Sequence, residues 1–599
     1  MARSLKRTPT SGIVSPQRKC IVVIPLLFTL APALMICTCL ARYCPTRYLE
    51  SLEESDPTHP LVPYTSSLLD VFRALPLGLL IGLITPLGGL GDTIGNKASM
   101  KKGLIGTWFA SALPLALLAA TQFGGVTATP YMSLGVMALT QLVSAVSVAL
   151  LVPNAMGYLW RQTAPGVRLA AMLFMLCTLS LLCVGVSTVV QVVIDTILPD
   201  IDVPSYLGPD TQYLWPCLLT LPLVGVSPVF YLMLRRSKTK LDPGTKRALA
   251  DTLGGMGYML VASAPVVWWL LYTLVDLQEV IVLPAAIDAF EVWMVAGVVA
   301  LLGLTLVLIS TPRRCKAPLS KKLKHYPAVR RYILTGLLLG TGVTLASLMG
   351  TVAAELIVYP EAPSVSPLAE YRPYGLGAVP FLCAGALSLP LLLLAPCLKH
   401  STAFTQLLLL LSVLVSVSLG AFWDDVTDKV SHPLGLVAVC TLPASLMVLA
   451  SLLVLHRLSV SVPAGQRGPK SMPWTNRCSL TSAHFMLAFV LPQLLLNPFS
   501  DPLSALLAVF EDSTPASLLA EGPTAYVCLC AVGALGMYLV SGLRGVYTDA
   551  EHVVVPVEAV IAIEEGRGPP RRRAKAGDKR RLRSKNASPN LSSSPVAEF

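Results

Sequence analysis

The sequence predicts an all-α integral membrane protein with about 14 transmembrane helices and with both termini in the cytosol. Of its 599 residues, 54% are hydrophobic and 13% are charged, a balance outside the range of soluble globular proteins. The hydrophobic residues gather in stretches of about 20, the length that crosses roughly 30 Å of hydrocarbon as a helix. The stretches are 21–41, 71–90, 104–122, 132–152, 169–190, 213–234, 253–274, 292–310, 333–358, 376–398, 404–423, 433–455, 482–497 and 525–543.

Lysine and arginine residues orient these stretches in the membrane. If the N-terminus is cytosolic, all but five of the 45 Lys and Arg residues fall in segments predicted to be cytosolic. Basic residues near a helix end resist translocation and therefore mark the cytosolic side. Because one register satisfies every loop, the same pattern supports the number of spans. The five exceptions are Arg42, Arg47, Arg73, Arg372 and Lys429.

A large soluble helical protein is the alternative that the stretches exclude. A helix that covers a soluble core carries polar residues along one face at helical period. Stretches such as Gln406–Leu414 carry no such face. The lipid bilayer is therefore the predicted environment of these helices.

The net charge of +12 does not indicate a nucleic-acid partner, because much of it lies in the predicted cytosolic tail, 544–599. Clustered basic residues beside a membrane attract anionic lipids of the cytosolic leaflet by about 1 kcal/mol per residue. We therefore expect a basic, disordered tail with anionic lipids as one partner. The simpler interpretation is an orientation anchor and a solubilising end. The cluster consists of Arg571, Arg572, Arg573, Lys575, Lys579, Arg580, Arg581, Arg583 and Lys585.

Two long basic loops divide the chain. One follows the sixth span and the other follows the eighth, so the first six and the last six spans are predicted to form two bundles. Transporters built from two such halves hold the substrate between them, near the bilayer midplane. The predicted parts are a cytosolic N-terminus (1–20), an N-terminal six-helix bundle (21–234), cytosolic linkers (235–332) with an inserted helix pair (253–310), a C-terminal six-helix bundle (333–543) and the tail (544–599).

The predicted cytosolic loop between spans two and three, 88–97, carries the most informative motif, GGLGDTIGNK. It resembles the cytosolic signature of the major facilitator superfamily, G-x-L-[AG]-D-R-x-G-R-[RK], on the same side and in the same place along the chain. The resemblance implies two six-helix bundles and a conformational switch, in which a tight turn and an acid meet basic groups as the halves rock. The switch residues that it assigns are Gly88, Asp92, Gly95 and Lys97, while Thr93 and Asn96 replace the two arginines.

Three stretches of the C-terminal half are similar to the proton-associated sugar transporters, a prostein-like group related to the plant sucrose symporters. They are 350–360, Thr441-Leu442-Pro443 leading to Leu455-His456-Arg457, and 482–498 with a proline inside the span. The resemblance implies secondary transport of a small polar solute, a sugar, by alternating access and in symport with a proton. Spans nine to fourteen then correspond to the last six helices of that group.

The chain departs from that group where proton coupling would reside. Span one, Ile21–Ala41, has no charged residue, and span four ends in Pro153-Asn154 and Arg161 where the group has an acid. Glu355 is the family-like acid that remains within a span. Together with the missing motif arginines, these departures favour an alternative: a multi-pass membrane protein with a structural or interaction role and no transport activity.

Four residues are predicted to lie on a transport path. An ionisable side chain in the membrane is costly and usually faces a cavity or a partner, which favours Glu355. Gln141 and Ser144 lie one turn apart in span four, and Gln493 lies in span thirteen. The alternative for these amides and this hydroxyl is hydrogen bonding between helices, which such residues commonly provide in membranes.

We expect no enzymatic activity, no cofactor and no metal. Asp424–Asp428 has the D-D-x-x-D spacing that binds magnesium diphosphates in prenyl-transferring enzymes, in which carboxylates hold a metal that bridges phosphate oxygens. That chemistry needs a second acidic cluster, and the other acidic loops, 195–210 and 501–512, lack the compact pattern. The cluster also falls in a predicted outside loop, away from cytosolic diphosphates.

Overall fold

The computed structural model consists of helices joined by turns in the part of the chain that it describes. All of the described residues belong to one compact unit, 1–550. They are 16–37, 44–45, 48–49, 51–53, 56–62, 65–125, 129–163, 165–185, 215–234, 298, 301–302, 327–358, 379–398, 402–422, 426, 433–460, 478–496 and 522–543.

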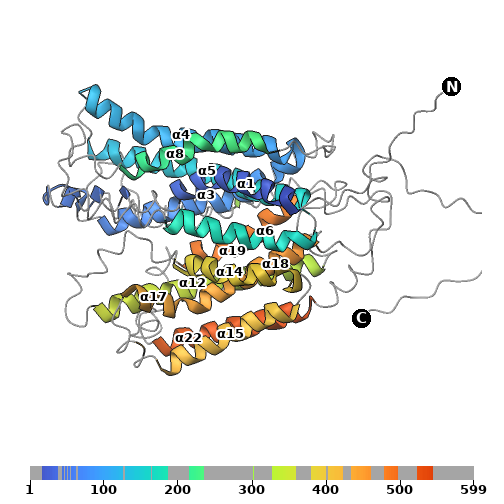
Figure 1. Cartoon of the computed structure of the whole chain (residues 1–599). Coiled ribbons are helices and arrows are strands. Elements are labelled where there is room, and N and C mark those ends of the chain that lie inside the picture. Colours follow the sequence, from blue (N-terminus) through green and yellow to red (C-terminus); the bar gives the residue numbers. More distant parts are fainter. Residues whose placement is uncertain are drawn as a thin grey trace, which may run out of the picture. The chain divides into compact units, whose positions relative to one another are not determined.

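The helices fall into two groups along the chain, which we call the N-terminal set and the C-terminal set (Figure 1). The N-terminal set comprises α1 (Pro16–Met35), α3 (Thr65–Ile94), α4 (Asn96–Phe123), α5 (Pro130–Gln162), α6 (Pro165–Ser180), η3 (Leu181–Gly185), which continues α6 as a π-helix, and α8 (Trp215–Met233). The C-terminal set comprises α12 (Pro327–Val358), α14 (Val379–Leu398), α15 (Thr402–Ala421), α17 (Pro433–Cys440), α18 (Leu442–Val460), α19 (Cys478–Leu496) and α22 (Gly522–Ser541).

Every predicted span outside 253–310 coincides with a described helix. The predicted inserted pair, 253–310, lies outside the described residues except for 298 and 301–302, so the total number of spans and the division into two six-helix bundles stay predictions. Within the described part, four helices are long and apolar enough to cross a bilayer by length and composition alone. They are Asn96–Thr121, Pro130–Gln162, Thr402–Ala421 and Leu442–Ser459.

Two helices differ from their predicted spans for identifiable reasons. The apolar stretch of span four ends at 152, but α5 continues to Gln162, because Asn154 and Arg161 find hydrogen-bond partners on α3 and α4. Span twelve is interrupted at Thr441, since Pro443 has no backbone N–H to donate within the helix. At the break, the Val437 carbonyl accepts both the Thr441 hydroxyl at 2.7 Å and the Thr441 backbone N–H at 2.9 Å.

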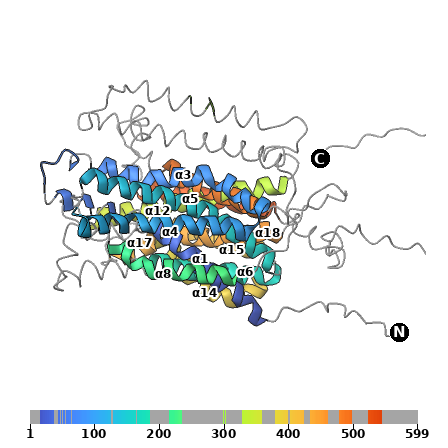
Figure 2. The same ribbon diagram turned by 90° about the horizontal axis from the view of Figure 1, so that it is seen from above.

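Helices pack against one another within each set and also between the two sets (Figures 1 and 2). In the N-terminal set, α5 packs against α3 and α4, while α8 packs against α1 and α4. In the C-terminal set, α12 contacts α17, α18, α19 and α22, while α15 contacts α18 and α22. Between the sets, α19 packs against α3 and α5, and α6 packs against α14 and α18. Segments far apart in the sequence therefore form a common interface.

Small residues allow α4 and α5 to approach closely. A Cβ atom built on Gly103 would lie 2.7 Å from Cγ of Leu151 and 3.1 Å from the carbonyl oxygen of Ser147. A Cβ atom on Gly106 would lie 2.4 Å from Oγ of Ser147. Between helices in lipid there is no hydrophobic driving force. Small residues instead let the helix backbones come close enough for van der Waals packing to stabilise the contact.

The substitution Gly103→Leu is expected to destabilise the folded protein. Forcing extra carbons into a filled contact costs about 1–3 kcal/mol, and here a backbone carbonyl blocks the space. Thermal unfolding of the detergent-solubilised protein, followed by loss of the monodisperse peak, should show a lower midpoint. Gly135→Leu is the matched control, because nothing lies within 4 Å of a Cβ atom at that glycine. Equal midpoints for the two variants would contradict the packing described.

Candidate functional site

The candidate site lies where the predicted cytosolic ends of the helices meet, and we call these the inner ends. Hydrogen bonds join the end of α3 to α5, the start of α4 to α8, and the start of α6 to α18. The start of α19 lies against α3 and α5. These helix ends, which the charge pattern predicts to lie on one side of the membrane, thus lie in contact with one another.

The facilitator-like motif forms a helix end and a one-residue turn. Residues 88–94 belong to α3 and α4 begins at Asn96, so Gly95 is the whole connection. Gly95 has φ +96°, a conformation that residues with a Cβ atom rarely adopt. The expected tight turn is therefore present, although most of the motif is helical and is not a loop.

Two of the three motif glycines that precede this turn, Gly88 and Gly91, let the C-terminal set approach α3. A Cβ atom on Gly88 would lie 2.6 Å from Cβ of Ala483 in α19. A Cβ atom on Gly91 would lie 1.5 Å from Oδ1 of Asn154 and 3.1 Å from Oγ of Ser479. These contacts leave no space for a larger residue, which gives both glycines a steric role.

Asn154 connects three helices at this point. Its side chain is fully buried, and the two hydrogens of its Nδ2 are shared among three acceptors: the Leu87 carbonyl at 3.2 Å, Oγ of Ser99 at 2.9 Å and the Leu150 carbonyl at 2.7 Å. The backbone carbonyl of Asn154 accepts a hydrogen bond from Nδ2 of Asn96 at 3.1 Å. One neutral side chain thereby ties α3, α4 and α5 together.

Asn96 extends this group to a cation. Its Oδ1 accepts a hydrogen bond of 2.7 Å from the guanidinium of Arg161, in the last turn of α5. Asn96 stands where the facilitator signature has an arginine, so an amide here accepts from an arginine of the neighbouring helix. A hydrogen bond to a charged donor is stronger than one between neutral groups.

Lys97 fixes the inner end of α8. Its ammonium donates to the carbonyls of Leu234 and Leu232, at the C-terminus of α8, and lies 5.0 Å from the ring centroid of Tyr231. The Tyr231 hydroxyl donates in return to the Lys97 carbonyl at 3.0 Å. A cation at a helix C-terminus satisfies open carbonyls and opposes the negative end of the helix dipole.

Arg168, at the start of α6, joins the two sets. One nitrogen donates to the carbonyls of Trp160 at 2.6 Å and Thr163 at 3.1 Å, both at the end of α5. The other donates to the carbonyl and the hydroxyl of Ser459, in the last turn of α18, at 2.7 and 3.1 Å. The Arg168 side chain is buried, and this one cation binds two helix C-termini from different sets. We call these contacts of Arg168 the clamp.

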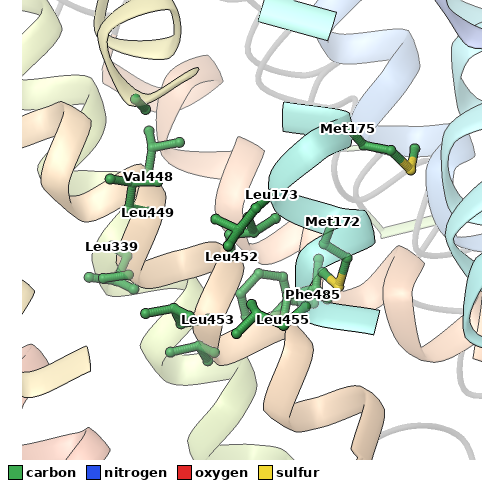
Figure 3. Close-up of a cluster of buried hydrophobic side chains, with 14 of the residues drawn as sticks. Met172, Leu173, Met175, Leu339, Val448, Leu449, Leu452, Leu453, Leu455 and Phe485 are labelled. Atoms are coloured by element: carbon green, nitrogen blue, oxygen red, sulfur yellow. The ribbon is translucent and has the colours of Figure 1, made fainter. Parts of the chain in front are cut away.

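Apolar side chains fill the interface next to this clamp (Figure 3). Leu173 of α6 belongs to the same buried cluster as Leu452 of α18 and Phe485 of α19. The same cluster continues into both sets, so the inner half of the interface is packed. Its labelled members in Figure 3 are Met172, Leu173, Met175, Leu339, Val448, Leu449, Leu452, Leu453, Leu455 and Phe485.

The described contacts join two of the four predicted path residues, Gln141 and Ser144. Gln141 and Ser144 are buried in α5, and the Ser144 hydroxyl donates to the Gln141 carbonyl at 2.8 Å. Glu355 lies in α12 and Gln493 in α19, but their side chains lie outside the described part, as does that of Asp92 in α3. Their role in a transport path stays a prediction.

Asn154 and Arg168 are site residues that sequence analysis did not assign. Asn154 was considered only as a departure from a family pattern, and Arg168 only as one of the basic residues that orient span five. An asparagine between apolar helix residues was the available signal for the first, because a buried amide requires partners. No sequence signal distinguishes the clamp of Arg168 from ordinary topological charge.

The described residues contain no group of three or more His, Cys, Asp or Glu side chains placed to hold a metal ion. The aspartate cluster, 424–428, lies outside the described residues except for 426. The diphosphate-binding alternative is therefore not tested by this structure.

No protein-family model and no curated protein matches the sequence. Among solved structures, the human organic anion transporter MFSD10 (TETRAN) matches over 87% of this chain and 99% of its own, with 13% identity and a TM-score of 0.51. The proton:xylose symporter XylE matches over 86% of this chain and 95% of its own, with 15% identity and a TM-score of 0.46. An auto-inhibited POT family peptide transporter matches over 88% and 97%, with 14% identity and a TM-score of 0.46.

The likeness to MFSD10 shows a helix arrangement of the major facilitator type. At 13% identity it speaks for the fold alone. With the helices that are long enough to cross a bilayer, it makes this chain a multi-pass integral membrane protein. The fold-level part of the sequence prediction is thus confirmed.

Asn154→Ala is expected to lower the free energy of unfolding by about 1–3 kcal/mol, since it removes two hydrogen bonds that join α5 to α3 and α4, each worth about 0.5–1.5 kcal/mol. Urea or heat unfolding in detergent measures the loss. Ser416→Ala is the control, because that buried hydroxyl donates to the Ser412 carbonyl of its own helix at 2.9 Å. A loss at Asn154 no larger than that at Ser416 would show that the amide does not join the helices.

Proposed function

We propose that this protein is a secondary transporter that moves a small polar solute by alternating access, with a sugar as the first class to test. The observation that carries the proposal is the interface between the two helix sets. Among the described residues, hydrogen bonds of Arg168 and Ser482 cross this interface near the inner ends, and buried apolar side chains of both sets pack beside them. An interface of this kind can close and open as a gate.

Several hydrogen bonds between described residues cross the interface. Arg168 reaches Ser459, the Ser482 hydroxyl donates to the Pro153 carbonyl at 3.1 Å, and the Ser388 hydroxyl donates to the Leu173 carbonyl at 3.3 Å. Their acceptors are mostly backbone carbonyls, which water can also satisfy. When the inner side opens, water therefore replaces the donors that these carbonyls lose, and the apolar side chains of the two sets separate. The carbonyls keep hydrogen-bond partners in both states. We infer that the described conformation is closed toward the cytosol.

Uncharged groups within the helices favour a neutral solute. The Ser144 hydroxyl donates to the Gln141 carbonyl, and the Thr344 hydroxyl donates to the Gly340 carbonyl at 2.8 Å. A hydroxyl that already donates to its own helix keeps lone pairs that accept from a solute hydroxyl. A polyhydroxylated solute such as a sugar can supply those donors. Coupling to a proton would rest on Glu355, in α12.

A structural or interaction role without transport is the second candidate. It is favoured by the buried cluster that runs from α1 and α5 into α12, α18 and α19 without a break between the sets. Continuous packing between the two sets would suit a protein in which the sets do not separate.

Uptake into proteoliposomes separates these candidates. A panel of labelled sugars, with and without an imposed pH gradient, should show saturable uptake of at least one sugar and its acceleration by the same unlabelled sugar on the other side. Stimulation by the gradient would add proton symport. No flux for any member of the panel, from protein that is folded and oriented, would contradict transport of a sugar.

Arg168→Gln is expected to open the inner interface. Ser482 is fully buried between the sets, so a cysteine placed there should react slowly with a membrane-impermeant thiol reagent from the cytosolic side. Loss of the clamp should raise its labelling rate severalfold, because each charged hydrogen bond contributes about 1.5–3 kcal/mol.

The matched control is a cysteine at Ser416, which is buried within the C-terminal set. Its labelling should stay slow with either residue at 168. An unchanged rate at 482 in the Arg168→Gln background would show that the clamp does not hold the sets together. A parallel rise at 416 would instead indicate general unfolding.

A further inference from the structure

The lipid-facing surface of α4 changes character near its inner end. Lys101, Ile105 and Trp108 follow at the spacing that places residues on one helix face. All three side chains are exposed, with 59% of Ile105 and 47% of Trp108 accessible. Lys102, also exposed, adjoins them, and Phe109 is 57% exposed. The exposed surface of α4 thus carries two lysines near its inner end, followed along the helix by large apolar side chains.

The inner end of α8 extends this surface. The contacts of Lys97 with the C-terminus of α8 hold that end against the first turn of α4. Leu232 is 73% exposed and Met233 is 56% exposed. Figures 1 and 2 show α4 and α8 as neighbours along their length. The two helices therefore present a joint apolar surface that begins beside Lys101 and Lys102.

The spacing between the lysines and Trp108, and the positive charge of the lysines, both match an anionic phospholipid. Seven residues separate Lys101 from Trp108, about 10 Å along a helix, which spans the distance from a headgroup to the upper acyl chains. On the predicted topology this end faces the cytosolic leaflet, where the anionic lipids are. Neither α4 nor α8 contains an acidic residue. No carboxylate of these two helices therefore competes for the ammonium groups.

We propose that the inner ends of α4 and α8 bind an anionic phospholipid of the cytosolic leaflet. Its phosphate lies between Lys101 and Lys102. Its acyl chains cover Ile105, Trp108 and the exposed end of α8. Each lysine near a membrane surface favours an anionic over a neutral lipid about fivefold. The site is separate from the C-terminal tail, and it does not depend on whether the protein transports a solute.

Quenching of tryptophan emission tests the proposal on the full-length protein in nanodiscs. Brominated phosphatidylglycerol and brominated phosphatidylcholine are compared at low mole fraction, and the contribution of Trp108 is the difference between the native chain and Trp108→Phe. We expect phosphatidylglycerol to quench Trp108 at a mole fraction at least fivefold lower. In Lys101→Gln/Lys102→Gln the two lipids should quench alike, while Lys101→Arg/Lys102→Arg should keep the preference.

Two further measurements distinguish this site from the C-terminal tail and from effects of the tryptophan substitution. Arg571→Gln/Arg572→Gln/Arg573→Gln removes charge from the tail and should leave the preference at Trp108 unchanged. Native mass spectrometry needs no tryptophan, and it should show less retained phosphatidylglycerol in Lys101→Gln/Lys102→Gln than in the native chain. Equal quenching by both lipids in the native protein would overturn the proposal. So would a preference that survives removal of both lysines or disappears with the tail charges.

Discussion

Basic side chains that donate to helix C-termini are the interaction on which the inner side of this protein depends. Lys97 holds the end of α8, Arg168 holds the ends of α5 and α18, and Arg331 donates to the Gly542 carbonyl just beyond α22 at 2.6 Å. These helices all run toward the predicted cytosolic side and expose open carbonyls there. The charges that orient the chain in the membrane therefore also close its helix ends.

The described contacts between the two sets combine this charged hydrogen bonding with apolar packing. Arg168 acts between helices whose inner halves are already packed by apolar side chains such as Leu173 and Leu452. In a water-poor environment a charged hydrogen bond to a carbonyl is strengthened by the low dielectric. Because the same carbonyls are satisfied by water when exposed, the contact is suited to breaking and reforming. A gate needs both properties.

Charge and hydropathy could predict the helices, because span length and the position of lysine and arginine follow from the bilayer itself. The tight turn at Gly95 was also predictable from a motif. Asn154 and Arg168 were not, since their roles arise from contacts between helices that lie far apart in the sequence. The predicted path of Gln141, Ser144, Glu355 and Gln493 rests on residue type, helical spacing and a family resemblance, none of which fixes the direction of a side chain on a helix.

The central claim is that the inner ends of the two sets separate and rejoin during function. Spin labels at Ala98 in α4 and Leu334 in α12, both exposed, report the distance between the sets when it is measured by pulsed electron resonance in nanodiscs. The account predicts two distance populations, with a ratio that changes when a transported solute is added. A single distance that no solute of the sugar panel alters would contradict it and would favour a rigid, non-transporting protein.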